Sequence, residues 1–471
     1  MHQDYFAKHN SLRQENRETN IHMGKTYNLT DGNITKTLFR LALPIMGTSF
    51  AEMAYSLIDM IWVGKIGTEA VAAVGTVGFF TWLANAFILI PKIGAGVGVA
   101  QSAGQKDMEE AKKYIKHSLQ MAVCLALIYG FIMIVFRKGL IGFFNLGEAR
   151  IIKSAIDYLV IVSCGFIFYF INPVFTAVFN GYGDSQTPFI INTIGLIANV
   201  ILDPLLILGI GPFPRLEVIG AALATVISQG IATLIFIIKA RKTIVIFSGI
   251  HLFKKPDLTH VKMIANMGLP TALQSGLFST IGMVLARIIA QWGATPIAVQ
   301  KIGSQIEAIS WMTAGGFQSA MSAFVGQNYG AKKWERVKKG YFTGMTIVSV
   351  IGIFATALLF FGARLLFSVF IKEEEAIRLG IQYLKILGFS QLFMCIEITT
   401  AGAFYGIGKT IPPSITGIIL NVLRIPGALI LSSTSLGLDG IWWAISVSSI
   451  FKGIVLTVWY IIVLKKQFIY R

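Results

Sequence analysis

The sequence predicts an all-α polytopic membrane protein with twelve transmembrane helices, arranged as two six-helix bundles related by a pseudo-twofold axis along the membrane normal. The first observation behind this fold class is composition. Of 471 residues, 55% are apolar, 47 are glycine and only 13% are charged, whereas about a quarter of the residues in a soluble domain are charged. A transmembrane helix needs roughly 20 mostly apolar residues, so the chain can supply about a dozen. The second observation is an internal repeat that relates the two halves of the chain.

Charge and side-chain chemistry exclude several function classes. The net charge of +17 comes from basic residues in short loops between apolar runs, which is a pattern of membrane topology and not of nucleic-acid binding. The cysteines Cys124, Cys164 and Cys395 stand in apolar stretches without CxxC spacing, and the six histidines lie in the tail or at loops and helix ends. We therefore expect no disulfide framework, no zinc site, no cofactor and no nucleic-acid partner.

Hydropathy divides the chain into an ordered series of segments. Residues 1–35 form a polar tail without the apolar core of a signal peptide. The first six-helix bundle covers 36–240, a cytosolic linker covers 241–260, the second bundle covers 261–464, and 465–471 form the cytosolic C-terminus. The predicted spans are 38–63, 70–103, 114–136, 152–180, 188–210, 219–239, 262–290, 295–327, 338–361, 377–405, 411–432 and 441–464.

Lysine and arginine in the loops set the orientation. With the N-terminus inside, the inner loops and termini hold 25 of these residues and the outer loops hold nine. We therefore expect a multi-pass protein of the plasma membrane with both termini in the cytosol. The runs at 70–103 and 295–327 are longer than a bilayer requires, so they should tilt, bend or extend into the cytosol.

The two bundles are internal repeats. A shift of 226 residues places Leu43-Pro44 on Leu269-Pro270, and VAQSAGQKD at 99–107 on VGQNYGAKK at 325–333. Shifts of 220 to 225 continue the match through turn glycines and prolines. Each half has an even number of spans, so the repeats are parallel and face each other across a central cleft. Alternating-access transporters use this layout, because one bundle can rock against the other around a bound substrate.

Ionisable residues inside the spans are the functional candidates, because each is costly to hold in hydrocarbon. The acids are Glu52, Asp59, Asp203, Glu307 and Glu397. The bases either extend toward the membrane surface or balance a neighbouring acid; they are Lys92, Arg287, Lys301, Lys385, Arg424 and Lys452.

Five polar side chains from four spans should meet in the first bundle. Asp59 and Asp203 lie at matching depths in the outer halves of spans 1 and 5. Asn199 precedes Asp203 by one turn on the same helix face, and spans 6 and 4 place Thr225 and Tyr158 at a similar depth. Their oxygens suit either a Na⁺ ion, bound by Asp59, Asn199, Asp203 and Thr225, or a buried carboxylate that takes up a proton.

The second bundle does not repeat this cluster. The positions equivalent to the two aspartates and the threonine hold Leu285, Ile425 and Ile445, although Asn421 and Tyr383 remain. A polar core kept only for structure would more readily persist in both halves. We therefore interpret the cluster as functional, with a satisfied polar core as the alternative.

Five motifs spread over residues 36–464 resemble the multidrug and toxic compound extrusion (MATE) transporters. They are LALPIMGTSFAEMAYSLIDMIWVGKIG, NGYGDSQTP, NVILDPLLILG, GAALATVIS and AFVGQNYGAKKWERVKKG. The resemblance to prokaryotic members implies a hinge at Pro44. Some branches carry an acid in span 7, but LPTALQSGLFSTIG has none here, so we expect coupling in the first bundle. The ion-coupling residues that the resemblance implies are Asp59, Asn199, Asp203, Thr225, Tyr158 and Glu52.

Other deep residues could line the cleft, where aromatic rings suit aromatic cations, or could simply pack between helices. Glu307 and Glu397 either contact substrate or pair with Lys301 or Arg424. The remaining cleft candidates are Tyr55, Phe278, Trp311 and Met312.

The leading hypothesis is a secondary active antiporter, not an enzyme, that exports organic cations or amphipathic drugs in exchange for H⁺ or Na⁺. The alternative is a lipid-linked oligosaccharide flippase of the same superfamily, whose diphosphate substrate would need a basic cleft; Arg287, Lys301 and Arg424 leave this open. An intramembrane lipid-modifying enzyme fits less well, because the spans hold no DDxxD-type acid pair. The expected partners are a small molecule and the bilayer, and we expect a monomer.

Overall fold

The computed structural model describes residues 28–469, and this part of the chain is helical, with no strand. Residues 1–27 of the predicted tail lie outside the described residues. The helices are α2 (Ile34–Gly64), α3 (Thr68–Gln105), α4 (Met108–Val135), α5 (Arg137–Gly142), α6 (Ala149–Tyr182), α7 (Gln186–Leu208), α8 (Glu217–Lys242), α9 (Ile244–Phe247), α10 (Leu258–Ile289), the 3₁₀ helix η1 (Ala290–Trp292), α11 (Ala294–Gly330), α12 (Trp334–Phe361), α13 (Ala363–Ser368), α14 (Glu374–Gly406), α15 (Ile411–Val422), α16 (Arg424–Ser432) and α17 (Leu438–Ile469).

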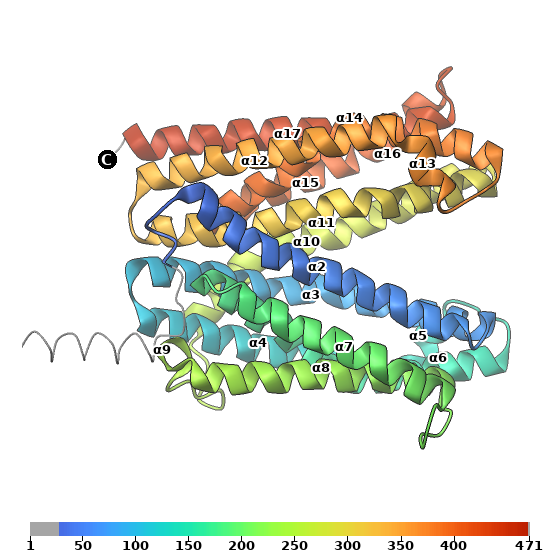
Figure 1. Cartoon of the computed structure of the whole chain (residues 1–471), viewed down its shortest axis with the longest axis horizontal. Coiled ribbons are helices and arrows are strands. Elements are labelled where there is room, and N and C mark those ends of the chain that lie inside the picture. Colours follow the sequence, from blue (N-terminus) through green and yellow to red (C-terminus); the bar gives the residue numbers. More distant parts are fainter. Residues whose placement is uncertain (1–27, 470–471) are drawn as a thin grey trace, which may run out of the picture.

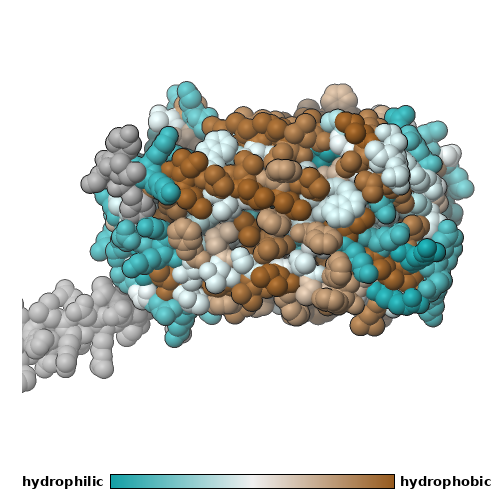
Figure 2. Space-filling view, turned by 90° about the horizontal axis from the view of Figure 1, so that it is seen from above, coloured by the Kyte–Doolittle hydropathy of each residue, from teal (hydrophilic) through white to brown (hydrophobic). Residues whose placement is uncertain are grey.

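A broad apolar area lies between two hydrophilic ends on the face of the molecule that Figure 2 shows. Within the described residues, eleven helical segments are long and apolar enough to cross a membrane. They correspond to the predicted spans, and the twelfth span is the more polar α11. The predicted span 411–432 is divided into α15 and α16, because Pro426 has no N–H to bond the carbonyl of Val422. The predicted all-helical membrane fold is confirmed.

The helices form two lobes lying side by side (Figure 1). The N-lobe contains α3 to α8, and the C-lobe contains α11 to α17. Two helices contact both lobes: α2 packs on α11 and α7, and α10 packs on α3 and α15. The first half of α2 buries Leu38, Leu41 and Ile45 in the core of the C-lobe. The first helix of each repeat therefore ties its own half to the other.

Small side chains let α2 pass closely between the lobes. Met46 packs against Gly316 of α11, where an added side chain would overlap it. The next residue, Gly47, lies so near the ring of Phe189 in α7 that it could carry no side chain without moving that ring. The change from C-lobe to N-lobe contacts thus occurs at residues 46–47.

The crossing lies one turn after Pro44, which sits inside the continuous helix α2. Proline has no N–H, so the carbonyl of Arg40 loses its usual helical donor. The hydroxyl of Ser185, at the start of α7, donates to this carbonyl at 3.4 Å. Pro44 therefore frees a backbone acceptor that bonds the N-lobe, which is the local weakness expected of a hinge.

At one end of the molecule the two lobes meet backbone to backbone. Gly104 of α3 faces the carbonyl of Gln327 in α11, and Gly330 faces the carbonyl of Gln101, with no room for a side chain at either glycine. The amide of Gln101 also donates to the carbonyl of Gly406 at 2.8 Å. These contacts hold the lobes together at this end, which we call the closed end.

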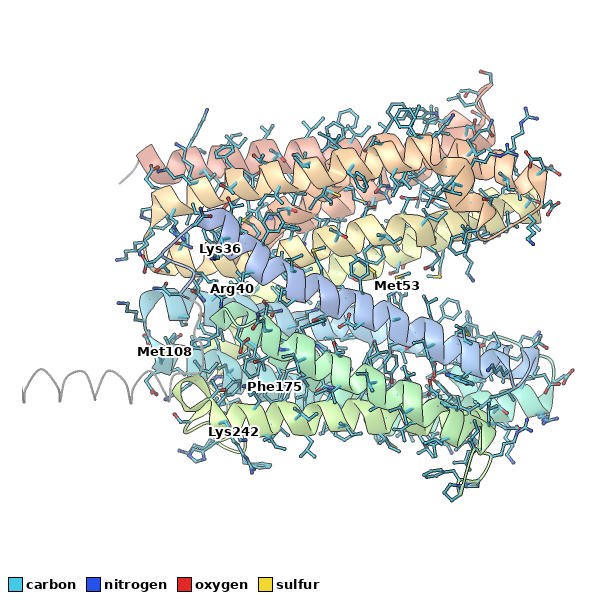
Figure 3. The ribbon with its side chains drawn as sticks, viewed as in Figure 1. Lys36, Arg40, Met53, Met108, Phe175 and Lys242 are labelled. Atoms are coloured by element: carbon cyan, nitrogen blue, oxygen red, sulfur yellow. The ribbon has the colours of Figure 1, made fainter. Side chains whose placement is uncertain are left out.

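Basic residues gather toward the closed end. Figure 3 places Lys36, Arg40 and Lys242 in this part of the molecule. Lys106 directly follows α3, and Lys333 directly precedes α12 in the short turn after α11. This is the end that the positive-inside rule predicts to face the cytosol.

The connection between the lobes is fastened to α4. His260, near the start of α10, lies between Glu110 and Asp257, at 2.9 and 2.7 Å from their carboxylate oxygens. Its ring stacks on His117 with 5.2 Å between centroids, and the N–H of Asp257 donates to His117 Nε2 at 2.9 Å. The hydrogen bond from His260 lowers the pKa of Asp257 to about 2. The end of the linker is thereby held against the N-lobe.

The close contact at Gly104 predicts the effect of one methyl group. Gly104→Ala places that methyl against the Gln327 carbonyl and should destabilise the closed end by about 1–3 kcal/mol. A single cysteine at position 322, in a background without Cys124, Cys164 and Cys395, should then react roughly ten-fold faster with an impermeant maleimide added at this end.

The matched control is Gly78→Ala, because Gly78 lies in the same helix and an added methyl there has nothing within 4 Å. Equal labelling rates in the two variants would show that the glycine contact does not hold the lobes together.

Candidate functional site

α7 presents one polar face to its neighbours. Gly195, Asn199 and Asp203 recur at four-residue intervals and so share a face. Gly195 allows close approach to α8, since a side chain there would meet Ala232 at 3.4 Å. Asn199 and Asp203 have no exposed surface, and the Asn199 amide donates to Asp203 Oδ1 at 3.0 Å.

Three other helices bring side chains to this face. α2 supplies Asp59, which lies within electrostatic range of Asp203. α6 supplies Tyr158, whose phenol lies near both carboxylates and near Thr225 of α8. The structure thus places the five residues predicted from spans 1, 4, 5 and 6 together inside the N-lobe. We call these five residues the N-lobe cluster.

The N-lobe cluster contains more acceptors than donors. Within the described residues, four buried oxygens of the cluster have no hydrogen-bond partner, one on each of Asp59, Asn199, Asp203 and Thr225. No lysine or arginine in the described chain forms an ion pair with either aspartate. Buried polar atoms without partners are rare and usually mark a missing ligand. This oxygen set fits a proton or a Na⁺ ion, which binds oxygen ligands.

Two further predicted residues lie close to the N-lobe cluster. The hydroxyl of Tyr55, predicted to line the cleft, donates to the carbonyl of Thr225 at 3.5 Å and so faces the cluster. Glu52 lies two turns before Asp59 on α2 and interacts electrostatically with Lys92 of α3. Glu52 therefore lies nearer the middle of the molecule than the cluster does.

A cavity of about 1050 Å³ lies between the lobes, lined from α3 and α6 on one side and from α10, α11, α14 and α15 to α17 on the other. No residue of the N-lobe cluster lines it. A cavity of this size matches the upper range of sites for drug-sized molecules. The molecule therefore has a space for a ligand and a separate group of acids.

The cavity explains the polarity of α11. This helix contributes more of the lining than any other helix in the described chain, including Gln300, Ser304, Gln305 and Ser319. A span that faces a water-accessible cavity does not need an apolar surface on that side. α11 is accordingly the predicted span that does not qualify as apolar enough.

The C-lobe wall of the cavity carries its own polar network. Gln391 donates to Glu307 Oε2 at 3.0 Å, and Tyr383 lies beside the same carboxylate. Arg424 donates to the hydroxyls of Ser448 and Ser449. A buried ion pair joins Lys452 to Glu397 at 3.0 Å. The two arginine bonds are Nε to Ser448 Oγ at 2.6 Å and Nη2 to Ser449 Oγ at 2.9 Å.

The predicted cleft residues divide between cavity and packing positions. Glu397 pairs with Lys452 and not with Lys301 or Arg424, and the ammonium of Lys385 lies over the ring of Phe360 at 5.3 Å. Tyr55 and Met312 are absent from the lining. The predicted residues that do line the cavity are Phe278, Glu307, Trp311 and Glu397.

Sequence reasoning missed the C-lobe network because it compared only equivalent positions of the repeat. Asn421 and Tyr383 are retained there, but the carboxylate comes from Glu307 on another helix, and Gln391 holds it in place. The signal was present in the unbalanced Arg424 and in the serine pair at 448–449. A fixed shift along the sequence compares equivalent positions of the two repeats, so it does not detect a polar residue on a neighbouring helix.

Comparison with known proteins agrees with this architecture. The MatE family matches twice, at residues 44–205 and 270–430, so the second match begins 226 residues after the first and confirms the predicted repeat. The chain is 30% identical to a probable multidrug resistance protein NorM of Thermotoga maritima, over 89% of this chain and 90% of that protein. It is 25% identical to an FAD transporter of Shewanella oneidensis, over 92% and 95%.

A solved structure of a MATE protein in a bent conformation superimposes with a TM-score of 0.86, at 25% identity, covering 94% of this chain and 99% of that one. Both matched segments, the relatives and the fold agree over nearly the whole described chain. The chain therefore belongs to the MatE family, the multidrug and toxic compound extrusion transporters.

Proposed function

We propose that the protein exports organic cations or amphipathic drugs in exchange for H⁺ or Na⁺, by alternating access between its two lobes. Its family and the names of its relatives support drug efflux. None of the relatives described above is named as a flippase. The ion exchange is the further step, and it depends on the N-lobe cluster.

The observation that carries the proposal is the separation of acids from cavity. Asp203 is buried, Asp59 is partly buried with its Oδ1 enclosed, and the two lie close together without a basic partner in the described chain, while the cavity lies elsewhere. Two neighbouring carboxylates shielded from water repel each other when both are ionised. A proton or a Na⁺ ion relieves that repulsion, so the cluster has two states that differ in charge.

α2 connects the two states of the cluster to the lobes. It carries Asp59 in the half that packs on α7 of the N-lobe, and its other half packs in the core of the C-lobe. Loss of the repulsion between Asp59 and Asp203 lets α2 and α7 repack, and this movement is passed to the C-lobe through the crossing at residues 46–47. The ion and the drug then favour different arrangements of the lobes, which is the requirement for exchange.

The direction of exchange follows from the topology prediction. With both termini in the cytosol, the closed end is the inner end, and the N-lobe cluster lies toward the outer side. The ion reaches the cluster from outside, where its concentration or electrochemical potential is higher. Binding of the ion drives the release of the drug to the outside. The lobes then return to their earlier arrangement.

Removing one charge from the cluster should stop coupled transport. Asp59→Asn and Asp203→Asn keep the side-chain shape but remove the group that takes up the ion. In vesicles with an imposed proton or sodium gradient, each variant should reduce gradient-driven dye efflux to the level of empty vesicles while its abundance in the membrane stays near that of the wild type.

The control is Asp157→Asn, the same chemical change next to Tyr158 but at a residue outside the cluster, which should leave efflux unchanged. Wild-type pumping by both cluster variants would rule out coupling through the N-lobe cluster.

The hinge assignment predicts a separate kinetic effect. Pro44→Ala restores an N–H that can bond the Arg40 carbonyl and so removes the acceptor now used by Ser185. α2 should become stiffer, so the turnover rate of efflux should fall while the equilibrium dissociation constant of the dye changes much less.

Pro412→Ala serves as the comparison, because Pro412 occupies the first turn of α15, where an N–H has no helical partner. Unchanged turnover in Pro44→Ala would remove Pro44 from the mechanism.

A further inference from the structure

The charges that line the cavity have an uneven balance. Its basic side chains are Lys92, Lys301, Arg424 and Lys452, whereas its only acidic ones in the described chain are Glu307 and Glu397. Charges facing a confined space with low-dielectric walls act strongly on a bound molecule. The lining therefore has a formal excess of two positive charges, or of one when Glu52, which interacts with Lys92 from outside the lining, is included. A site for organic cations would be expected to have the opposite balance.

The ion pair in the wall does not change this excess. Lys452 and Glu397 approach to 3.0 Å, and their side chains are only 8% and 11% exposed. Glu397 also acts electrostatically on Arg424, but only at longer range than on Lys452. The remaining carboxylate, Glu307, accepts a hydrogen bond from Gln391 and likewise lies within electrostatic range of Arg424. Lys301 has no acid of the lining within ion-pairing distance in the described chain.

Arg424 is the most constrained of these bases. It is 7% exposed, yet no carboxylate in the described chain lies within ion-pairing distance of its guanidinium. Its Nε and Nη2 donate to the neutral hydroxyls of Ser448 and Ser449, and the guanidinium carbon lies 5.9 Å from the centre of the Phe278 ring. The serines fix the plane of the guanidinium and leave Nη1 without an acceptor among the described residues. A buried arginine held by neutral groups keeps its charge available to a carboxylate or phosphate ligand.

Lys301 supplies a second unpaired charge. It is exposed, lines the same cavity, and forms no ion pair in the described chain. Two residues later, Gly303 packs directly on the ring of Tyr383, which itself lies within electrostatic range of Arg424. The backbone that carries Lys301 is thus packed against the wall that holds Arg424.

Apolar and aromatic side chains continue the same surface. Phe278 and Trp311, both about half exposed, line the cavity together with Leu285, Ile289 and Ile297. A ligand whose anionic group meets Arg424 therefore has an apolar surface on which to place the rest of its body. This combination of a few polar groups and a mainly apolar wall is usual for small-molecule sites.

We propose that the cavity binds amphiphilic organic anions through Arg424 and Lys301, with a carboxylate at the two bases and an aromatic or aliphatic body on Phe278 and Trp311. This inference rests on the proposed function only in taking the cavity as the drug-binding site. It narrows the substrate class from organic cations and amphipathic drugs to amphiphiles that carry a negative group.

The test compares two fluorescent probes that share one apolar body. Purified protein in nanodiscs of neutral lipid is titrated with 1-pyrenebutyrate, which carries a carboxylate, and with pyrenebutyl-trimethylammonium, which carries a fixed positive charge. The wild type should bind the carboxylate probe at least about ten-fold more tightly, the scale of a charge-assisted contact. Equal affinities, or tighter binding of the cationic probe, would overturn the proposal.

Variants locate the contact. Arg424→Gln should weaken binding of 1-pyrenebutyrate about ten-fold or more with little effect on the cationic probe, and Arg424→Lys should restore part of the affinity. Lys301 is exposed, so Lys301→Gln should disturb folding less than a change at the buried Arg424. It should weaken binding of 1-pyrenebutyrate by a smaller factor. Lys385→Gln, a lysine of the same lobe that does not line the cavity, should bind like the wild type.

Equilibrium binding separates this proposal from the proposed function. Asp59→Asn should still prefer the carboxylate probe, because Asp59 does not line the cavity. Loss of the preference in Arg424→Gln and Lys301→Gln, with retention in Asp59→Asn, supports an anion site whatever the coupling ion is. An unchanged preference in both basic variants would show that the anion binds elsewhere.

Discussion

The neighbouring carboxylates of the partly buried Asp59 and the fully buried Asp203 are the constraint on which the rest of the structure depends. An ionised group inside a membrane protein needs a partner, because its solvation is lost. In the N-lobe the partners available from the chain are one amide, from Asn199, and neutral hydroxyls. In the C-lobe, by contrast, Glu397 has Lys452 and Glu307 has Gln391. Each acid of the C-lobe wall thus has a partner within the described chain, whereas the two aspartates of the N-lobe cluster have no basic partner there.

This difference gives the two lobes different tasks despite their common origin as repeats. In the proposed exchange, the N-lobe cluster takes up the ion, whereas the C-lobe wall lines the cavity. Helix α2 is the link, because it carries Asp59 in one half and packs in the C-lobe core with the other. The glycine contact at the closed end, between Gly104 and Gln327, is the part of the interface that would separate in the proposed alternating access.

Much of the fold was predictable because it depends on patterns that the sequence displays directly. Apolar runs of membrane length predicted the helices, and the repeat at a shift of 226 predicted two related bundles, as the double family match confirms. Three features were less accessible. The polarity of α11 has meaning only once the cavity beside it is known. The division at Pro426 could not be predicted because another proline, Pro44, stands inside a continuous helix. The crossing of α2 depends on contacts between distant residues.

The candidate site was predictable to a similar extent. The depth of residues along the spans grouped Asp59, Asn199 and Asp203 with nearby hydroxyl groups, and the structure places these side chains near one another. Depth says nothing about direction around a helix, so Tyr55 was assigned to the cleft although it bonds the Thr225 backbone. It also says nothing about charge balance between helices, so the excess of basic side chains in the cavity emerged only from the structure.

The central claim is that ion and drug compete through the N-lobe cluster without sharing a site. The most direct measurement is the dissociation constant of a fluorescent dye for purified protein as pH is lowered or Na⁺ is raised, in the wild type and in Asp59→Asn. In the wild type, dye affinity should weaken either as pH falls or as the Na⁺ concentration rises. In Asp59→Asn the dye should still bind, but its affinity should no longer depend on either ion. Wild-type affinity that ignores both ions, or an identical dependence in Asp59→Asn, would contradict it.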